Sequence, residues 1–205
     1  MKIYIENQVL EYKNDKNEMD NILNEIDNIV SKSSKILSHM VIDDFEVYEG
    51  YYDYFLDNIR VIEKVEVISL TYKELVDDIL ISTMDYIGRI PFKIEELSNS
   101  FYKNPDRQAW NNLNDLLGGI SWIMNSFTSI DQDSRLKDVI SSYENWNLYA
   151  KEVFALKDIL PDLEGSLSSG DNITIADILS YEILPIFNEM EVKLLDLVKM
   201  EGSFR

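Results

Sequence analysis

The sequence contains no cysteine and only one histidine, His39, in 205 residues. The lack of cysteine excludes disulfides, thiol catalysis and cysteine-bound zinc or iron–sulfur clusters within the chain. No histidine lies beyond residue 71, so the later part of the chain has neither Glu-x-x-His pairs for a di-iron site nor a phosphotransfer histidine. With one histidine, a serine–histidine nucleophile is not expected either. We predict that the protein is not an enzyme and uses no cofactor.

Basic residues are also scarce: 19 Lys and Arg stand against 38 Asp and Glu, which gives a net charge of −19. The acidity is spread along the chain, with 7 basic and 15 acidic residues in 1–71 and 12 and 23 in 72–205. Phosphate backbones and anionic lipid surfaces repel such a protein, so we predict no nucleic-acid partner and no membrane partner. Solubility is the ordinary explanation of this charge. A basic protein partner and mimicry of nucleic acid are the alternatives.

Long apolar runs and export signals are missing from the sequence as well. No run of eighteen apolar residues occurs, so no transmembrane helix is expected. The first residues, MKIYIENQVLEYKND, lack the apolar stretch and the small-residue cleavage site of a signal peptide. We therefore expect a cytoplasmic protein, and a bacterial source is the accompanying guess.

Short strand and helix patterns alternate through the first 71 residues. Residues 2–11 form two strand-like runs around a polar turn at Asn7–Gln8, and Asp15 with Glu18 has capping-box spacing before an apolar helical stripe. Two more strand-like runs flank Asp43–Asp44, a helical turn follows, and KVEVISL has the β-branched composition of a strand. The predicted order is strand, strand, helix, strand, strand, short helix, strand.

This order and length resemble the β-grasp, or ubiquitin-like, fold. The resemblance implies that the first and last strands pair in parallel at the centre of the sheet, with the helix across one face. Their inward side chains would be Ile3, Ile5, Val65 and Val67. Ubiquitin-like modifiers and sulfur carriers act through a free C-terminal Gly-Gly. Here the last strand continues directly into a helix, so a role in conjugation or sulfur transfer is not supported.

Beyond Thr71 the hydrophobic period becomes 3.6 residues, which is typical of helices. Thr71 and Glu74 have the spacing of a capping box at the start of the first helix. Polar breaks at 104–106 (NPD), 129–134 (SIDQDS) and 168–171 (SSGD) then separate four long apolar stripes. Short polar connections between long helices favour an antiparallel four-helix bundle.

The predicted fold class is therefore α+β, with two domains. Residues 1–71 form a β-grasp-like α/β domain, and residues 72–205 form the helical bundle. The third helix is expected to run without interruption from Leu136 to Leu167. All three tryptophans fall on apolar stripes and are expected in the core.

Three prolines, Pro91, Pro161 and Pro185, lie inside the predicted helices. An interior proline removes one backbone hydrogen bond and costs about 3 kcal/mol in an isolated helix. Because helical periodicity continues on both sides of each proline, we predict kinks that curve the bundle around its core. The alternative interpretation is a kink that opens a groove for a partner helix.

The stretch GDNITIADILSYEILP resembles the end of a group of uncharacterised bacterial proteins with a small α/β head and a C-terminal helical region. The resemblance is based on a Gly-Asp, an Ala-Asp, a Tyr-Glu and a proline, and it implies no activity. On this basis Asp177, Tyr181, Glu182 and Pro185 form our candidate interaction or structural motif.

Other possible sites are weaker. The segment starting at Asp131 begins like a calcium loop but lacks its glycine, and Ser142 stands where the bidentate glutamate is needed. Gly118 and Gly119 fit no phosphate loop and are expected to let a neighbouring helix approach closely. Acidic pairs such as Glu182 and Glu189 could form a magnesium site or an acid–base pair, but no metal site is predicted.

The leading hypothesis is a non-enzymatic protein-interaction module, an adaptor or chaperone-like protein. Its partner would be a protein of unknown identity, either basic or offering an amphipathic helix, and homo-oligomers through the bundle are also plausible. The alternative is a metal-dependent hydrolase or a small-ligand-binding enzyme built on carboxylates of the helical domain.

Overall fold

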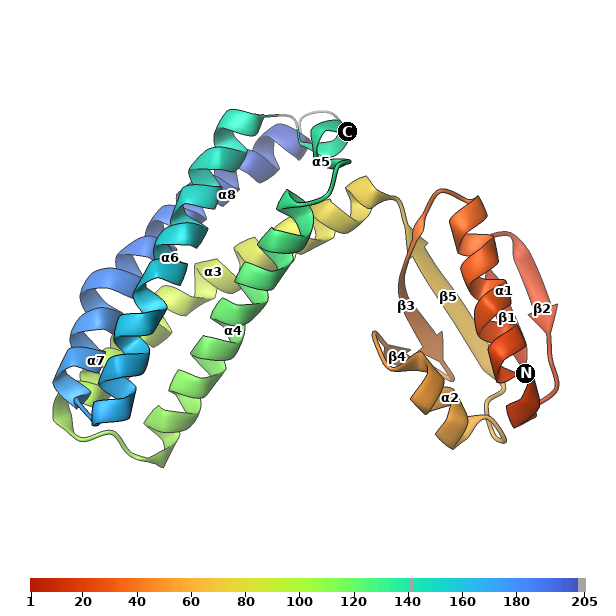
Figure 1. Ribbon diagram of the computed structural model, residues 1–205, viewed down its shortest axis with the longest axis horizontal. Coiled ribbons are helices and arrows are strands. Elements are labelled where there is room, and N and C mark those ends of the chain that lie inside the picture. Colours follow the sequence, from red (N-terminus) through yellow and green to blue (C-terminus); the bar gives the residue numbers. More distant parts are fainter. Residues whose placement is uncertain (141, 203–205) are drawn as a thin grey trace. The chain divides into compact units, whose positions relative to one another are not determined.

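The computed structural model describes residues 1–140 and 142–202, and the chain divides into two compact units, Met1–Leu75 and Val76–Arg205 (Figure 1). We call them the sheet unit and the helical unit. The structure is α+β, as predicted: an N-terminal five-stranded sheet is followed by a mostly helical region.

The sheet unit contains all five strands of the described chain. In sequence order its elements are β1 (Lys2–Ile5), β2 (Gln8–Glu11), a 3-10 turn (Lys16–Glu18), α1 (Met19–Lys32), β3 (Ile36–Ile42), β4 (Phe45–Val47), α2 (Tyr51–Asn58) and β5 (Lys64–Leu70). The strands lie in the order β2-β1-β5-β3-β4. Strands β1 and β5 are parallel, and the other neighbours are antiparallel.

The core of this unit lies on one face of the sheet. Ile3 pairs with Val65 and Ile5 with Val67, and all four side chains are buried. The parallel pairing of these strands and the inward direction of these side chains are therefore confirmed. The apolar stripe of α1 covers the same face, and Phe55 of α2 belongs to the same core cluster. The opposite face carries the alternate residues of each strand, as the period of two requires.

Tight turns of the sheet unit use left-handed backbone without glycine. The first hairpin turns at Glu6–Asn7, one residue earlier than predicted, and Glu6 has φ 51°. Asp43 and Asp44, with φ 46° and 69°, form the β3–β4 turn. The Asp43 carboxylate accepts hydrogen bonds from the backbone N–H groups of Glu63 (3.1 Å) and Lys64 (2.8 Å). This short polar side chain therefore joins the turn to the start of β5.

The helical unit consists of long helices and two short ones. They are α3 (Tyr72–Lys103), α4 (Arg107–Asp131), α5 (Leu136–Val139), α6 (Tyr143–Ser169), α7 (Asn172–Ile178), a π-helical turn (Leu179–Ile183) and α8 (Leu184–Gly202). Helix α3 starts in a closed capping box, because Thr71 and Glu74 each accept a hydrogen bond from the other's backbone N–H. Gly170, with φ 70°, ends α6 within the predicted break at 168–171.

The predicted third helix is interrupted, and that prediction was wrong. Ile140 is extended, with ψ 121°, and α6 begins afterwards with Ser142 as its N-cap. The Ser142 hydroxyl accepts a hydrogen bond from the Asn145 N–H, so a local cap competes successfully with a continuous helix. The next turn is held by the Trp146 indole N–H, which donates to Asp131 at 2.8 Å.

Within the helical unit, α3 lies along α7 and α8 in the antiparallel sense. Near the end of α3, the hydroxyls of Ser98 and Ser180 share a hydrogen bond. Closer to its middle, a Cβ added at Gly88 would lie 3.3 Å from the Glu191 carboxylate. On the other side of the unit, Phe127 of α4 stacks on Trp146 of α6 with ring centroids 5.2 Å apart.

Only one of the three tryptophans is in the core. Trp146 is buried as predicted, whereas Trp110 and Trp122 are 40% and 41% exposed. An apolar stripe on a helix is wider than the strip its neighbours cover, so residues at its margin remain partly exposed. Among the described residues, no helix is long and apolar enough to cross a membrane.

Candidate functional site

The predicted motif lies where the last helix changes its hydrogen-bonding pattern. Asp177, Tyr181, Glu182 and Pro185 are all exposed, and Tyr181 and Glu182 lie within the π-helical turn. In an α-helix the Pro185 ring would collide with the Tyr181 carbonyl and leave it without a donor. The wider π turn ends at Ile183, just before Pro185. Its different hydrogen-bonding pattern offers a way to avoid this collision while the helix continues.

The structure joins two motif residues through a partner from α3. The Tyr102 hydroxyl donates to the Asp177 carboxylate at 2.5 Å. This hydrogen bond, together with desolvation and the nearby Tyr181 hydroxyl, raises the pKa of Tyr102 to about 12. Glu182 and Pro185 take no part in this contact. Sequence reasoning missed Tyr102 because nothing in the spacing relates positions 75 residues apart.

No metal-binding cluster supports the carboxylate hypothesis. In the described parts of the chain, no group of three or more His, Asp or Glu side chains could hold a metal ion. In the calcium-like segment, the Asp133 carboxylate accepts hydrogen bonds from the guanidinium and the backbone N–H of Arg135. These bonds lower the pKa of Asp133 to about 2. Its bond to the Arg135 N–H forms an Asx turn ahead of α5, whose N-cap residue is Arg135.

The face of the sheet away from α1 carries a group of apolar and aromatic side chains that we call the sheet-face patch. Tyr4 is 38%, Val9 54% and Tyr48 62% exposed, while Val41 and His39 are half-buried. The register places Val9 beside Tyr4, and Val41 on the far side of β5 from Tyr4. The rings of His39 and Tyr48 stack with centroids 4.9 Å apart.

Charged side chains lie among the members of the sheet-face patch. Glu66 separates Tyr4 from Val41, and Glu46 is the partner of Val41 on β4. Lys64 pairs with Glu66 at 3.0 Å, and its ammonium lies 5.8 Å from the centroid of the Tyr4 ring. The patch therefore combines exposed apolar surface with carboxylates that are accessible at its centre and edge.

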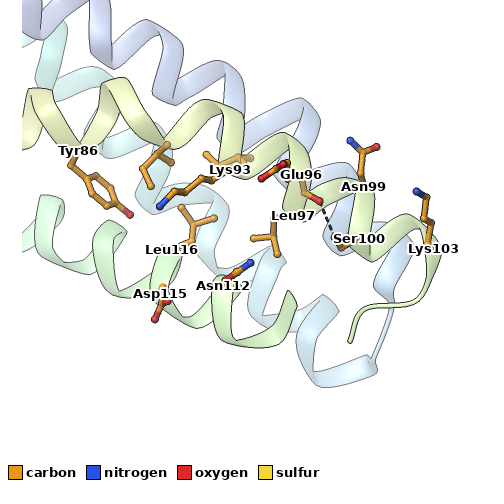
Figure 2. Close-up of a pocket in the computed structure, with 12 residues that line it drawn as sticks. Tyr86, Lys93, Glu96, Leu97, Asn99, Ser100, Lys103, Asn112, Asp115 and Leu116 are labelled. Atoms are coloured by element: carbon orange, nitrogen blue, oxygen red, sulfur yellow. Dashed lines mark hydrogen bonds between the residues drawn. The ribbon is translucent and has the colours of Figure 1, made fainter. Parts of the chain in front are cut away.

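A second concave surface lies in the helical unit, between the later half of α3 and the first half of α4. This α3–α4 groove has a volume of about 650 Å³ (Figure 2). Its floor is apolar and its rim is polar, with cations, carboxylates, amides and a hydroxyl. The lining residues are Tyr86, Ile90, Lys93, Ile94, Glu96, Leu97, Asn99, Ser100, Lys103, Asn112, Asp115 and Leu116.

Tyr86 closes one end of the α3–α4 groove. Its ring reaches from α3 to α4, where a Cβ at Gly119 would overlap the Tyr86 hydroxyl. Gly119 therefore permits a close approach, as predicted, although the group that approaches is a side chain. Among the described residues, the Tyr86 hydroxyl is the one buried side-chain oxygen or nitrogen without a hydrogen-bond partner. Burial, and then the charge of Asp115, raise the pKa of Tyr86, so the hydroxyl is protonated and able to donate.

Fold and surfaces together define an acidic α+β protein in which a small sheet unit precedes a helical unit. Two family models match this division. Residues 1–71 match the TP0873 N-terminal domain, and residues 78–193 match a domain of unknown function, DUF8042. The second match covers more than half of the sequence, so the chain belongs to the DUF8042 family. No curated protein and no solved structure matches the chain significantly.

Proposed function

We propose that the protein is a non-enzymatic protein-interaction module of the adaptor or chaperone-like type, and that the sheet-face patch is its docking surface. The observation that carries this proposal is the exposure of Tyr4, Val9 and Tyr48 on a sheet face without a covering helix of its own unit. Aromatic side chains contribute much of the binding energy at protein interfaces, so their exposure favours a binding role.

The chemistry of the patch favours a basic amphipathic helix as the partner segment. The apolar side chains would receive its apolar face, and Glu46 and Glu66 would attract its lysines or arginines. The net charge of −19 speeds the encounter with such a segment and repels acidic competitors. Both features agree with the partner expected from the sequence.

We further propose the finer fold assignment made from the sequence. The strand order β2-β1-β5-β3-β4, with β1 and β5 parallel, supports a β-grasp sheet unit. The long helices α3, α4, α6 and α7–α8 support a four-helix bundle in the helical unit. Pro91 and Pro161 lie inside helices that continue past them, which supports the kinks.

The test uses the full chain and a matched pair of variants. The double variant Tyr4→Thr/Tyr48→Thr removes two aromatic rings from the patch, and threonine keeps the strand propensity of position 4. Phe45→Thr is the control, because Phe45 is 69% exposed but its register partner, Ile42, lies on the buried face. Fluorescence anisotropy measures the binding of an amphipathic helical peptide made of lysine and leucine. In a second experiment, each chain is used to retain proteins from an extract of the native host.

We expect the wild type and Phe45→Thr to bind equally, and the double variant to bind about tenfold or more weakly. The same host protein should be lost from the double variant and kept by the control. If the wild type, the double variant and Phe45→Thr retain the host protein equally, the sheet-face patch is not the docking surface. An acidic peptide of the same apolar pattern that binds as well as the basic one would contradict the proposed role of Glu46 and Glu66.

A further inference from the structure

We propose that the α3–α4 groove is a binding site for a small molecule carrying an oxyanion group, a carboxylate or a phosphate, which is held between the Tyr86 hydroxyl and the Lys93 ammonium. This site lies in the helical unit and is independent of the sheet-face patch. Three observations carry the inference: a donor without an acceptor, a local structure built around that donor, and a lysine without a counter-ion.

The first observation is the Tyr86 hydroxyl. Buried hydroxyl groups in folded proteins almost always have a hydrogen-bond partner, because burial without one costs free energy. The described part of the chain contains one exception, the Tyr86 hydroxyl, and Tyr86 is one of the residues that line the α3–α4 groove. An acceptor brought by a ligand would supply the missing partner. The protonated hydroxyl donates, so the incoming group must accept.

The second observation is that the chain makes room for this hydroxyl. Position 119 has no side chain, and any Cβ there would displace the Tyr86 ring. Glycine inside a helix lowers its stability relative to alanine. A phenylalanine at 86 would avoid the unpaired oxygen with the same ring. Tyr86 and Gly119 therefore lower the stability of the helical unit in two ways, through a glycine inside α4 and through a buried oxygen without a partner. A binding role for the hydroxyl explains why both are present.

The third observation is the position of Lys93. Figure 2 shows its side chain extended along the groove toward Tyr86. In the described parts of the chain, no carboxylate lies within ion-pair distance of Lys93. The ammonium can only donate and the hydroxyl can donate as well, so an oxyanion placed between them would accept a hydrogen bond from each.

The rest of the rim limits the kind of molecule. Glu96 and Asp115 also line the groove and balance Lys93 and Lys103 in formal charge. A polyanion would meet these carboxylates, whereas a small molecule with one oxyanion can keep it at the Tyr86 end. The amide of Asn112 can bind the uncharged polar part of such a ligand. Because the groove has a volume of about 650 Å³, it is large enough for a drug-sized molecule.

The experiment titrates the full chain with inorganic phosphate and, separately, with butyrate, which carries a single carboxylate, and follows amide chemical shifts by NMR. We expect saturable shifts around residues 86–103 and 112–119, and the tighter of the two probes identifies the type of oxyanion. Tyr86→Phe and Lys93→Met should each weaken binding by about tenfold, the effect of one hydrogen bond to a charged group. Lys157→Met, at an exposed lysine of α6, is the matched control and should bind like the wild type.

Melting temperatures separate binding from folding. Without a probe, Tyr86→Phe should melt at a higher temperature than the wild type, because the unpaired oxygen is gone. A variant that is more stable and yet binds less tightly cannot owe its loss to misfolding. The proposal fails if neither probe gives saturable shifts in the groove, or if Tyr86→Phe and Lys93→Met bind as the wild type does. Equal weakening by Lys157→Met would show general charge attraction and would also overturn it.

Discussion

The two units place their irregular features in different parts of their structure. In the sheet unit, all four described non-glycine residues with positive φ, Glu6, Ser34, Asp43 and Asp44, lie in turns, and β3 shifts its register against β5 once, between Leu37 and His39. In the helical unit, Asp106, Ser142 and Asp171 are side-chain N-caps of the helices that follow them. Its irregularities lie inside the helices, as two interior prolines, a π-helical turn and a buried hydroxyl without a partner.

This difference shows where each unit can carry function. Strain in a turn is compensated locally, as when the Asp43 carboxylate binds two backbone N–H groups, and the strands keep one register apart from the shift between Leu37 and His39. The sheet can therefore present a fixed row of side chains, the sheet-face patch. Irregularity inside a helix changes how neighbouring helices fit together, and π-helical turns occur frequently at functional sites. The α3–α4 groove and its unpaired Tyr86 hydroxyl belong to this second kind of surface.

The largest expected effect is in the sheet unit, at Asp43. Asp43→Ala leaves two backbone N–H groups without an acceptor and puts alanine in a left-handed conformation, so it should cost about 2–4 kcal/mol. Amide hydrogen exchange at Glu63 and Lys64 measures this locally and should accelerate strongly. Asp43→Asn keeps an acceptor and tolerates positive φ, so it should lose much less. If alanine and asparagine behave alike, the turn does not depend on its hydrogen bonds.

Two adjacent glycines in α4 provide a test of the helical unit with opposite signs. Gly119→Ala forces the Tyr86 ring to move and should destabilise the unit by about 1–3 kcal/mol. Gly118→Ala meets open space, and the higher helix propensity of alanine should stabilise the unit by about 0.5–1 kcal/mol. All three tryptophans lie between residues 110 and 146, so urea unfolding followed by tryptophan fluorescence reports on this unit.

The outcome at these glycines separates propensity from packing. If both alanine variants stabilise the helical unit, Gly119 is not a contact point for Tyr86 and the proposed end of the groove is wrong. If Gly119→Ala destabilises it, the double variant Gly119→Ala/Tyr86→Phe should still be destabilised, because the ring collides with the Cβ whether or not the oxygen is present.

A smaller effect is expected from Tyr86→Phe. Removing a buried hydroxyl without a partner should stabilise the helical unit by about 1 kcal/mol in the same urea experiment. No matching gain is expected at Tyr51 of the sheet unit, whose hydroxyl donates to the Tyr48 carbonyl at 2.8 Å. A loss of stability in Tyr86→Phe would mean that the hydroxyl has an acceptor, such as a bound water.

The smallest effect is a titration at the predicted motif. The pKa of Tyr102 is raised to about 12 in the folded chain from an ordinary value of 10.0. The stabilisation from its hydrogen bond to Asp177 is therefore fully present below pH 10 and is lost as the pH rises through about 12. Tyrosinate absorbance should show one high-pH transition that moves toward the ordinary value in Asp177→Asn. An unchanged transition would show that Asp177 does not hold the Tyr102 proton.

Local features were predictable because the interactions that create them span one helical turn or one strand. The capping box at Thr71, the break before Arg107 and the C-cap at Gly170 each follow from side chains within four residues of one another. The interruption of the third helix was missed, although Ser142 is a good N-cap residue. Apolar periodicity continued across it, and periodicity alone does not reveal a competing cap.

By itself, the sequence determined the order of elements, the change from sheet to helices near residue 71 and the inward faces of β1 and β5, because each depends on residue type and period. Tertiary structure alone decided which side chains meet across elements. Tyr102 reaches Asp177 75 residues later, and Asp43 reaches Lys64 21 residues later. The Tyr86 ring of α3 likewise packs against Gly119 of α4. Such contacts depend on the rotation and axial register of whole helices and strands, which are fixed only when all the elements pack together.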